Sequence, residues 1–174
     1  AVQRQKQSGL RLVTDGEFRR AWWHFDFLKA LAGCEIQKTQ GAVVAGRVTS
    51  GESVHVTGKL DFPADHPMIA HFKLLKDRCD LAGIMPKMTI PSPSMIHYRG
   101  GRDAVSREAY PDIDAFFVDL AMTYRKAVKA FYDAGCRYLQ LDDISFAYLC
   151  DPEQRAMLAE RGDDPEKQQG IYAG

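Results

Sequence analysis

Apolar residues at three-to-four spacing mark one long helix in the second half of the chain. They are Ile113, Phe116, Phe117, Leu120, Tyr124, Val128 and Phe131. Charged residues fall between them, so the spacing predicts an amphipathic helix with one packed face and one solvated face. Asp112 is the expected N-cap and Gly135 the expected end. Further helices are expected over residues 66–81 and after Pro152 and Pro165.

A run of helix end, glycine, apolar strand and polar turn occurs three times along the chain. The segments are QKQSGLRLVTDGE, DLAGIMPKMTIPSPS and YDAGCRYLQLDD. This order is typical of α/β units around a parallel sheet, whose strands are apolar because helices cover them. The pattern therefore predicts an α/β fold in which Tyr138, Leu139 and Leu141 belong to a buried strand.

Residues 34–62 follow a different pattern. The stretch GAVVAGRVTSGESVHVTGKLDF alternates apolar and polar residues around Gly and Ser turn signals, which predicts a β-hairpin or meander. It is either an insertion outside the main sheet or an excursion whose last strand, residues 56–60, rejoins that sheet. The sequence leaves both arrangements open.

Length and composition are typical of a globular protein with one core. The chain has 174 residues, of which 45% are hydrophobic. Lys plus Arg and Asp plus Glu total 23 each, and no basic run alternates with aromatic residues. A small-molecule partner is therefore expected rather than nucleic acid. Charges interrupt every apolar stretch before the roughly 18 residues that a membrane helix needs, so no membrane partner is expected.

The four cysteines, Cys34, Cys79, Cys136 and Cys150, form no CxxC pair. This usage favours reduced, buried and inert thiols in a cytoplasmic protein over disulfides. The chain starts at Ala1 with AVQRQKQSG, a segment typical of the last turns of a helix. We therefore expect an excerpt of a longer protein, which no signal peptide opens.

Acidic residues follow two of the expected strands. Asp15 and Glu17 come after the first, and Asp142 and Asp143 after the last. The carboxyl ends of parallel strands meet at one edge, where functional groups gather. Successive side chains point to opposite faces, so one of the last two aspartates is expected at the shared opening.

Each carboxylate also has a structural interpretation. Asp143 is expected mainly to cap a short helix in LDDISFAYL, which leaves Asp142 as the functional candidate. Glu17 is equally interpretable as half of a surface ion pair with the adjacent Arg19 or Arg20.

The segment RRAWWHFDFL is rich in aromatic residues, and such a density favours core packing. A flat heteroaromatic ligand stacked on Trp22 or Trp23 is the sharper alternative. His24 and Asp26 lack a nearby third metal ligand, and His66 and His71 fall on different faces of a helix, so no metal site is expected from this chain's own residues.

The segment TIPSPS after the middle strand predicts a rigid turn that exposes the hydroxyl of Ser92. This turn could bind a carboxylate or phosphate, or only end the strand. Nucleotide-binding and hydrolase motifs such as GxGxxG, GxxxxGK[ST], GxSxG and HExxH are absent from the sequence.

Taken in order, VTDGEFRR, the WxxDFL of residues 23–28, MTIPSPS and AGCRYLQLDD with its following FAYL resemble one family. They are similar to the catalytic domain of cobalamin-independent methionine synthase, especially its short single-domain bacterial relatives. The resemblance covers nearly all 174 residues. It implies a (β/α)8 TIM barrel and transfer of a methyl group from 5-methyltetrahydrofolate polyglutamate to the thiol of homocysteine, which zinc holds.

By this resemblance, Glu17 and Asp142 correspond to the carboxylates that hold the amino group of the amino-acid substrate, and Asp15 helps to shape the same turn. The physical chemistry agrees, because two anions at one opening favour an ammonium group. Trp22, Trp23 and Ser92 lie where the folate could pass.

The chain departs from the family in its metal ligands. The family's zinc is bound by an HxC pair, a Glu and a second Cys, all beyond the LQLDD strand, and this sequence stops at Gly174 without them. The excerpt is therefore expected to be inactive alone. A whole barrel needs about 250 residues, so residues 1–174 are expected to form a single partial barrel domain. Its exposed edges predict a homo-oligomer, a domain swap or a longer protein.

Two other functions remain open at this stage. The same fold could carry out zinc-dependent alkyl transfer from another donor to another thiol. Alternatively, the chain is a non-catalytic small-molecule-binding or interaction module that has lost its metal half.

Overall fold

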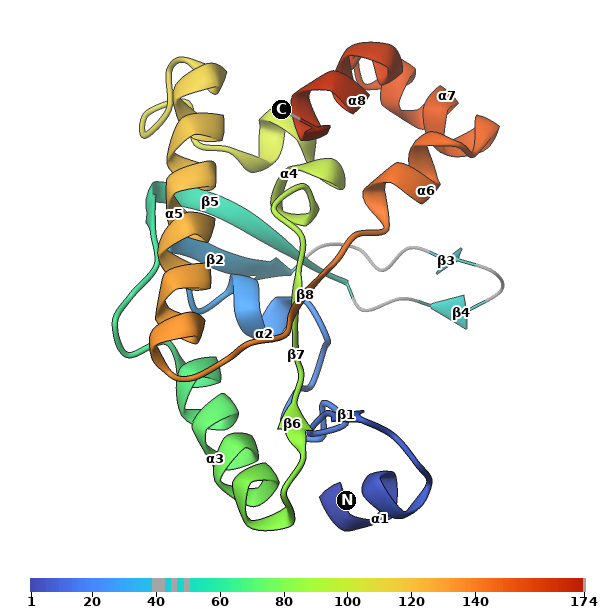
Figure 1. Ribbon diagram of the computed structural model, residues 1–174. Helices are drawn as coiled ribbons and strands as arrows, with labels where there is room; N and C mark the ends of the chain where they lie inside the picture. The colour runs from blue at the N-terminus through green and yellow to red at the C-terminus, as the bar shows by residue number, and fades with distance from the viewer. Residues whose placement is uncertain (39–42, 45–46, 49–50, 174) are drawn as a thin grey trace.

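A computed structural model describes residues 1–38, 43–44, 47–48 and 51–173 (Figure 1). The helices are α1 (Val2–Gln7), α2 (Phe25–Leu28), α3 (Pro67–Ala82), α4 (Met95–Tyr98), the 3-10 helix η1 (Gly101–Ala104), α5 (Ile113–Asp133), α6 (Ser145–Leu149), α7 (Pro152–Glu160) and α8 (Pro165–Ala173). The strands are β1 (Leu12–Val13), β2 (Ala32–Lys38), β3 (Val43–Val44), β4 (Arg47–Val48), β5 (Glu52–Asp61), β6 (Met85–Pro86), β7 (Met88–Pro91) and β8 (Leu139–Asp142).

Parallel strands form the centre of the molecule. β1 pairs with β6, and β8 pairs with β7. Only Lys87 separates β6 from β7; its N–H donates to Val13 O at 2.8 Å, whereas the next N–H, of Met88, donates to Tyr138 O at 3.0 Å. Neighbouring N–H groups point to opposite sides of a strand, so β1 and β8 flank the same segment on its two edges.

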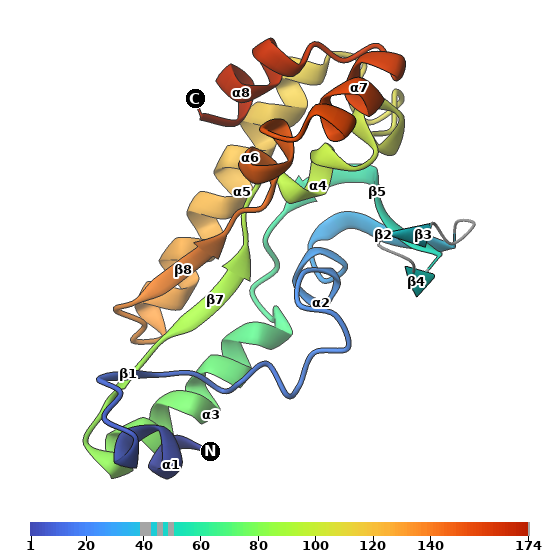
Figure 2. The same ribbon diagram turned by 90° about the vertical axis from the view of Figure 1, so that its right-hand side faces the viewer.

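The two long helices cover one side of these strands. In Figure 1, α3 and α5 line the left of the molecule, while α6 to α8 lie at the upper right, beyond the carboxyl end of β8. Figure 2 shows β7 and β8 side by side in front of α5. The expected mixed α/β architecture with parallel pairing is confirmed. The described pairings do not close into a barrel.

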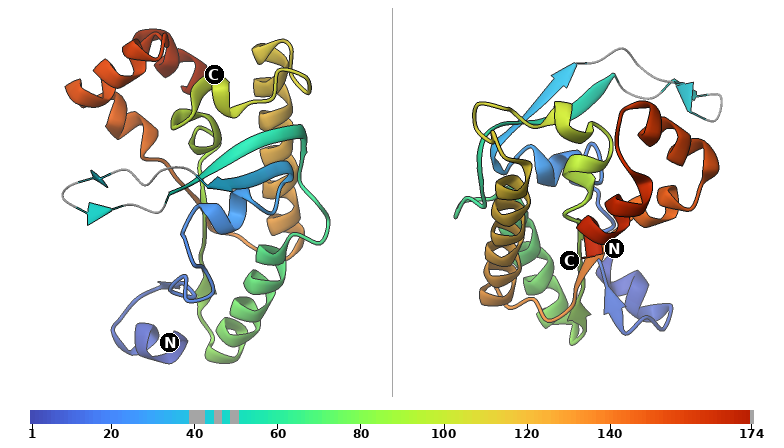
Figure 3. Two further views of the ribbon diagram at one scale, coloured as in Figure 1. Left: turned by 180° about the vertical axis from the view of Figure 1, so that it is seen from behind. Right: turned by 90° about the horizontal axis from the view of Figure 1, so that it is seen from above.

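The expected hairpin is present as an antiparallel ribbon. β2 pairs with β5 from Cys34 opposite Val56 to Lys38 opposite Glu52. Among the described residues, β5 reaches no parallel strand, and its one further bridge joins Val56 to Val105. The ribbon is therefore an insertion that crosses the strands, as the left view of Figure 3 shows. Parts of the expected hairpin, residues 39–42, 45–46 and 49–50, lie outside the described residues.

The core lies between α2, α3, α5 and the strands. Phe27, Phe72, Phe116 and Phe131 are fully buried in it. The N-cap expected for α5 is confirmed, because Asp112 Oδ1 accepts from the N–H of Asp114 at 3.0 Å. The other expected helices are confirmed as α3, α7 and α8.

One position of the predicted apolar stripe is wrong. Val128 is 44% exposed, and Ala127 is fully buried beside it. Successive helical residues are about 100° apart, so this turn of α5 presents the smaller neighbour to the core.

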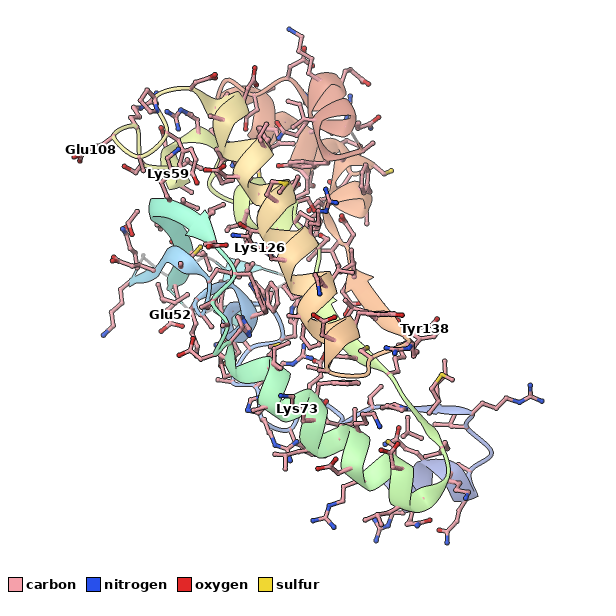
Figure 4. The ribbon with its side chains drawn as sticks, turned by 60° about the vertical axis from the view of Figure 1, so that its left-hand side comes forward. Glu52, Lys59, Lys73, Glu108, Lys126 and Tyr138 are labelled. Atoms are coloured by element: carbon pink, nitrogen blue, oxygen red, sulfur yellow. The ribbon has the colours of Figure 1, made fainter. Side chains whose placement is uncertain are left out.

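On the polar face, Lys126 bonds Asp61 at 2.6 Å, and Lys59 of β5 lies 3.5 Å from Asp119, so ion pairs join α5 to the ribbon (Figure 4).

Two expectations of burial are also wrong. Tyr138 is 43% and Leu141 45% exposed, because β8 pairs with β7 on one edge and no described element covers its outer face. Tyr138 projects outward from the strand in Figure 4.

Cys34, Cys79 and Cys136 are buried as expected, but Cys150 is exposed at the end of α6. None of the described helices is both long and apolar enough to cross a bilayer.

Phe131→Ala is expected to lower the free energy of unfolding by about 3–5 kcal/mol, because it opens a cavity beside Phe72. The two rings stand edge to face with centroids 6.1 Å apart. Val128→Ala on the same helix is the matched control and should cost less than about 1 kcal/mol. Urea denaturation measures both, and equal losses would contradict the assigned packing of α5.

Candidate functional site

The turn after β1 is built by short side-chain contacts to the backbone. Gly16 N–H donates to Thr14 Oγ1 at 3.1 Å, and Glu17 N–H donates to Asp15 Oδ1 at 3.0 Å. Glu17 has φ of 58°, and no other described non-glycine residue has positive φ. The left-handed backbone costs about 1–2 kcal/mol, a kind of strain that clusters at functional sites. Asp15 thus shapes this turn.

A buried guanidinium holds Glu17 in place. The Arg20 side chain is 3% exposed, and its Nη1 lies 3.0 Å from Glu17 Oε1. The same Nη1 donates to Trp23 O at 3.1 Å, and Nη2 donates to Thr89 O in β7 at 2.5 Å. The ion pair expected for Glu17 is present, but its partner Arg20 is buried rather than on the surface. Arg20 links the turn after β1 to β7.

Glu17 keeps part of its carboxylate available. Its side chain is 37% exposed, and the contact to Arg20 uses Oε1 alone. Within the described part of the chain, Oε2 forms no hydrogen bond or ion pair. This oxygen can accept a hydrogen bond from a ligand.

The two aspartates at the carboxyl end of β8 differ in their contacts: Asp142 ends the strand, and Asp143 follows it. Asp143 Oδ1 accepts from the N–H groups of Ser145 and Phe146 at 2.6 and 3.3 Å, which confirms its role as the cap of α6. Its Oδ2 accepts from Ser94 Oγ at 2.9 Å. Asp142 is half-buried and accepts from the side-chain amide of Gln140. Asp142 therefore has no capping duty.

Glu17 and Asp142 lie at the same end of the parallel strands. Arg20 connects the first turn to Thr89 O, Thr89 stands opposite Gln140 in the β7–β8 register, and Gln140 contacts Asp142. The carboxylates of Asp15, Glu17, Asp142 and Asp143 outnumber the guanidinium groups of Arg19 and Arg20. These named groups at the two strand ends therefore sum to a negative charge.

The sequence predicts that the TIPSPS turn exposes the hydroxyl of Ser92, but the structure buries it. Ser92 and Ser94 are 3% and 5% exposed, and their Oγ atoms are 2.7 Å apart. Ser94 Oγ also lies 2.9 Å from Ser145 Oγ. The buried hydroxyl of Tyr124 donates to Pro91 O at 2.9 Å. Because these groups bond one another, the turn ends β7 and exposes no Ser92 hydroxyl to a ligand.

The aromatic segment divides between core and surface. Phe25 and Phe27 are buried, and Trp23 packs against the same core. Trp22 is 42% exposed, with its ring edge-on to Phe25 at 6.1 Å. Of the two tryptophans considered for ligand stacking, only Trp22 offers a substantially open face.

The described residues do not fit a zinc site. No three His, Cys, Asp or Glu side chains gather within the ranges that the structure describes. Asp26 accepts from Trp22 N–H at 2.8 Å and bonds Lys29 at 2.7 Å, so it is not paired with His24. Burial raises the pKa of the Cys34 thiol to about 12, which opposes the thiolate that a metal needs.

The sequence reasoning missed the contacts of Gln140 and Ser94 at these strand ends, and it considered Arg20 only as a surface partner of Glu17. The contacts of Arg20 to Thr89 and of Ser94 to Asp143 span 69 and 49 residues. The one local signal is the spacing of Arg20, three residues after Glu17, which matches their ion pair.

The chain is similar to part of several longer bacterial proteins. The uncharacterized protein YxjH of Bacillus subtilis (strain 168) is 44% identical over 174 residues, which cover 99% of this chain and 44% of that protein. YxjG of the same organism is 42% identical over 175 residues, with the same coverage. The chain thus spans less than half the length of these curated relatives. No family model matches it.

Two solved structures have the same fold. A protein from Listeria monocytogenes, named as a candidate vitamin-B12-independent methionine synthase, is 45% identical with a TM-score of 0.76, over 98% of this chain and 45% of its own. A B12-independent methionine synthase from Shewanella sp. W3-18-1, in complex with selenomethionine, is 18% identical with a TM-score of 0.61, over 90% and 42%. The second likeness concerns the fold alone.

Arg20→Ala is expected to lower the free energy of unfolding by about 2–3 kcal/mol, because it leaves two backbone carbonyls without their charged donor. Arg19→Ala is the control; its side chain is 43% exposed and lies 3.8 Å from Asp15, so its loss should stay within about 0.5 kcal/mol. Thermal and urea unfolding measure both. Equal effects would show that Arg20 does not bridge the strands.

Proposed function

We propose that this chain forms the amino-acid-binding part of a methyltransferase. The premise is that the chain is related to the cobalamin-independent methionine synthases, its structural neighbours. The reaction is transfer of a methyl group from 5-methyltetrahydrofolate to the thiol of homocysteine. In this proposal Glu17 and Asp142 accept hydrogen bonds from the substrate ammonium group, and Asp15 maintains the turn that presents Glu17.

The observation that carries the proposal is the common position of Glu17 and Asp142 at one end of the parallel strands, with part of each carboxylate uncommitted. Net negative charge favours a cation at this point, and an ammonium group has three donors to share between the two side chains. Arg20 neutralises part of the charge of Glu17. The substrate ammonium group would therefore be recognised through the positions of the carboxylate oxygens as well as through their charge.

The zinc that the family implies does not fit the described residues of this chain. We therefore assign no step of thiol activation to them, and the chain's share of the reaction is recognition of the amino acid. Trp22 is the residue we assign to the folate side, since its open ring follows the Glu17 turn. Trp23 and Ser92 are weaker candidates, since the first packs on the core and the second is buried.

An incomplete (β/α)8 barrel accounts for the surfaces of this chain. Leu141 of β8 and Tyr138, which precedes this strand, are exposed, as are Phe18 at 86% and Leu81 at 82%. In a whole barrel, further strands and helices would cover such residues. The coverage of the relatives, less than half of their length, agrees with a partial domain.

Asp142→Asn and Glu17→Gln in the intact protein should each weaken homocysteine binding about 10- to 100-fold, which corresponds to loss of a charged hydrogen bond of about 1.5–3 kcal/mol. Isothermal titration calorimetry measures the affinity. Asp133→Asn, at the solvated end of α5, is the isosteric control and should bind as the unaltered protein does. Unchanged affinity in both site variants would refute the clamp.

A panel of thiols and methyl donors tests the reaction itself. Methyl transfer from 5-methyltetrahydrofolate to homocysteine is the expected result. Turnover with another thiol or donor alone would favour the alkyl-transfer alternative. Amino-acid binding without any turnover by the intact, zinc-loaded protein would favour a non-catalytic binding module.

A further inference from the structure

A separate cavity lies between α2, the ribbon strand β5, α4 and η1. Its volume is about 310 Å³. Apolar side chains form most of its wall, among them Phe25, Leu28 and Ile96. This volume is at the lower end of the range for ligand pockets, about 300–1,000 Å³, and suits a single-ring molecule.

His24 faces this cavity with its hydrogen-bonding capacity unused. The residue is 8% exposed and lies between the rings of Trp23 and Phe25, at centroid distances of 4.6 and 4.1 Å. Nδ1 and Nε2 are both buried without a partner, a condition found for no other side chain in the part of the chain that the structure describes. Buried polar atoms are normally bonded, so an unpaired imidazole in a cavity wall points to a missing ligand group.

The protonation state of His24 determines which hydrogen-bonding groups of a ligand its imidazole can pair with. Burial lowers its pKa to about 4, and the positive charge of Arg99 acts in the same direction. The ring is therefore neutral near pH 7, with one N–H donor and one bare nitrogen acceptor. A ligand hydroxyl can serve either nitrogen, because it both donates and accepts.

Arg99 supplies a positive charge to the same cavity. Its side chain is exposed, and its polar contact to a neighbouring side chain is a long one of 3.4 Å to the hydroxyl of Tyr148. The other polar lining groups are already engaged: Ser53 bonds His55 at 2.9 Å, and Asp103 bonds Arg107 at 3.3 Å. Arg99 is thus the group best placed to receive an anion.

We propose that this cavity binds a hydroxylated aromatic monocarboxylate, with the ring between the apolar walls, the carboxylate on Arg99 and the hydroxyl on His24. The carboxylate matches the planar fork of the guanidinium, which can hold it through two parallel hydrogen bonds. The ring matches the aromatic and aliphatic wall. The site is distinct from Glu17 and Asp142 and does not depend on methyl transfer.

The test uses 4-hydroxybenzoate as the probe, with the intact protein and isothermal titration calorimetry. Saturable binding is expected, and Arg99→Met should weaken it about tenfold or more, since it removes a charge-assisted pair. Arg125→Met, on the exposed face of α5, is the matched control and should leave the affinity unchanged. Benzoate and 4-hydroxybenzamide, which lack the hydroxyl and the charge respectively, should each bind more weakly.

His24→Phe and His24→Gln separate the role of the imidazole from packing. Phe keeps the ring stack and Gln keeps a donor and an acceptor, so affinity should fall in the first and be partly retained in the second. If either variant fails to fold, a shift of the His24 imidazole ¹⁵N resonances on addition of 4-hydroxybenzoate decides the point. No binding by the unaltered protein, no change with Arg99→Met, or unmoved resonances would overturn the proposal.

Discussion

The buried guanidinium of Arg20 is the interaction on which the arrangement of the strand ends depends. It joins Glu17, the carbonyl of Trp23 and the carbonyl of Thr89, so three segments meet at one side chain. A buried charge is costly unless it is paired and hydrogen-bonded. Arg20 meets that condition only while the turn after β1, the start of α2 and β7 keep their relative positions. The same bond network explains how Glu17 is maintained with a left-handed backbone.

Local features of this fold could be predicted from the sequence. The cap at Asp112 and the capping role of Asp143 depend on residues two or three positions away, so short-range patterns specify them. The helices after Pro152 and Pro165 follow from the same kind of signal. The acidic turns could be assigned to one end of the strands because parallel α/β units always orient their carboxyl ends together.

Features that depend on distant contacts could not be predicted. The hydroxyls of Ser92 and Ser94 are in a turn that looks exposed in sequence, yet Ser94 bonds Asp143, which follows β8, and Ser145 of α6. Tyr138 and Leu141 have the sequence of a covered strand, but coverage depends on elements that pack on it rather than on the strand itself. The sequence does not show that His24 lines a cavity while Asp26 bonds the backbone of Trp22, because both arrangements depend on how this segment packs.

Lys87, the single residue between β6 and β7, places β1 and β8 on the two edges of one backbone segment. Because Lys87 and Met88 donate in opposite directions, β1 and β8 take their alignment from one continuous piece of backbone. The backbone of residues 85–91 therefore sets the positions of β1 and β8 relative to each other, and with them the positions of the two acidic turns that follow.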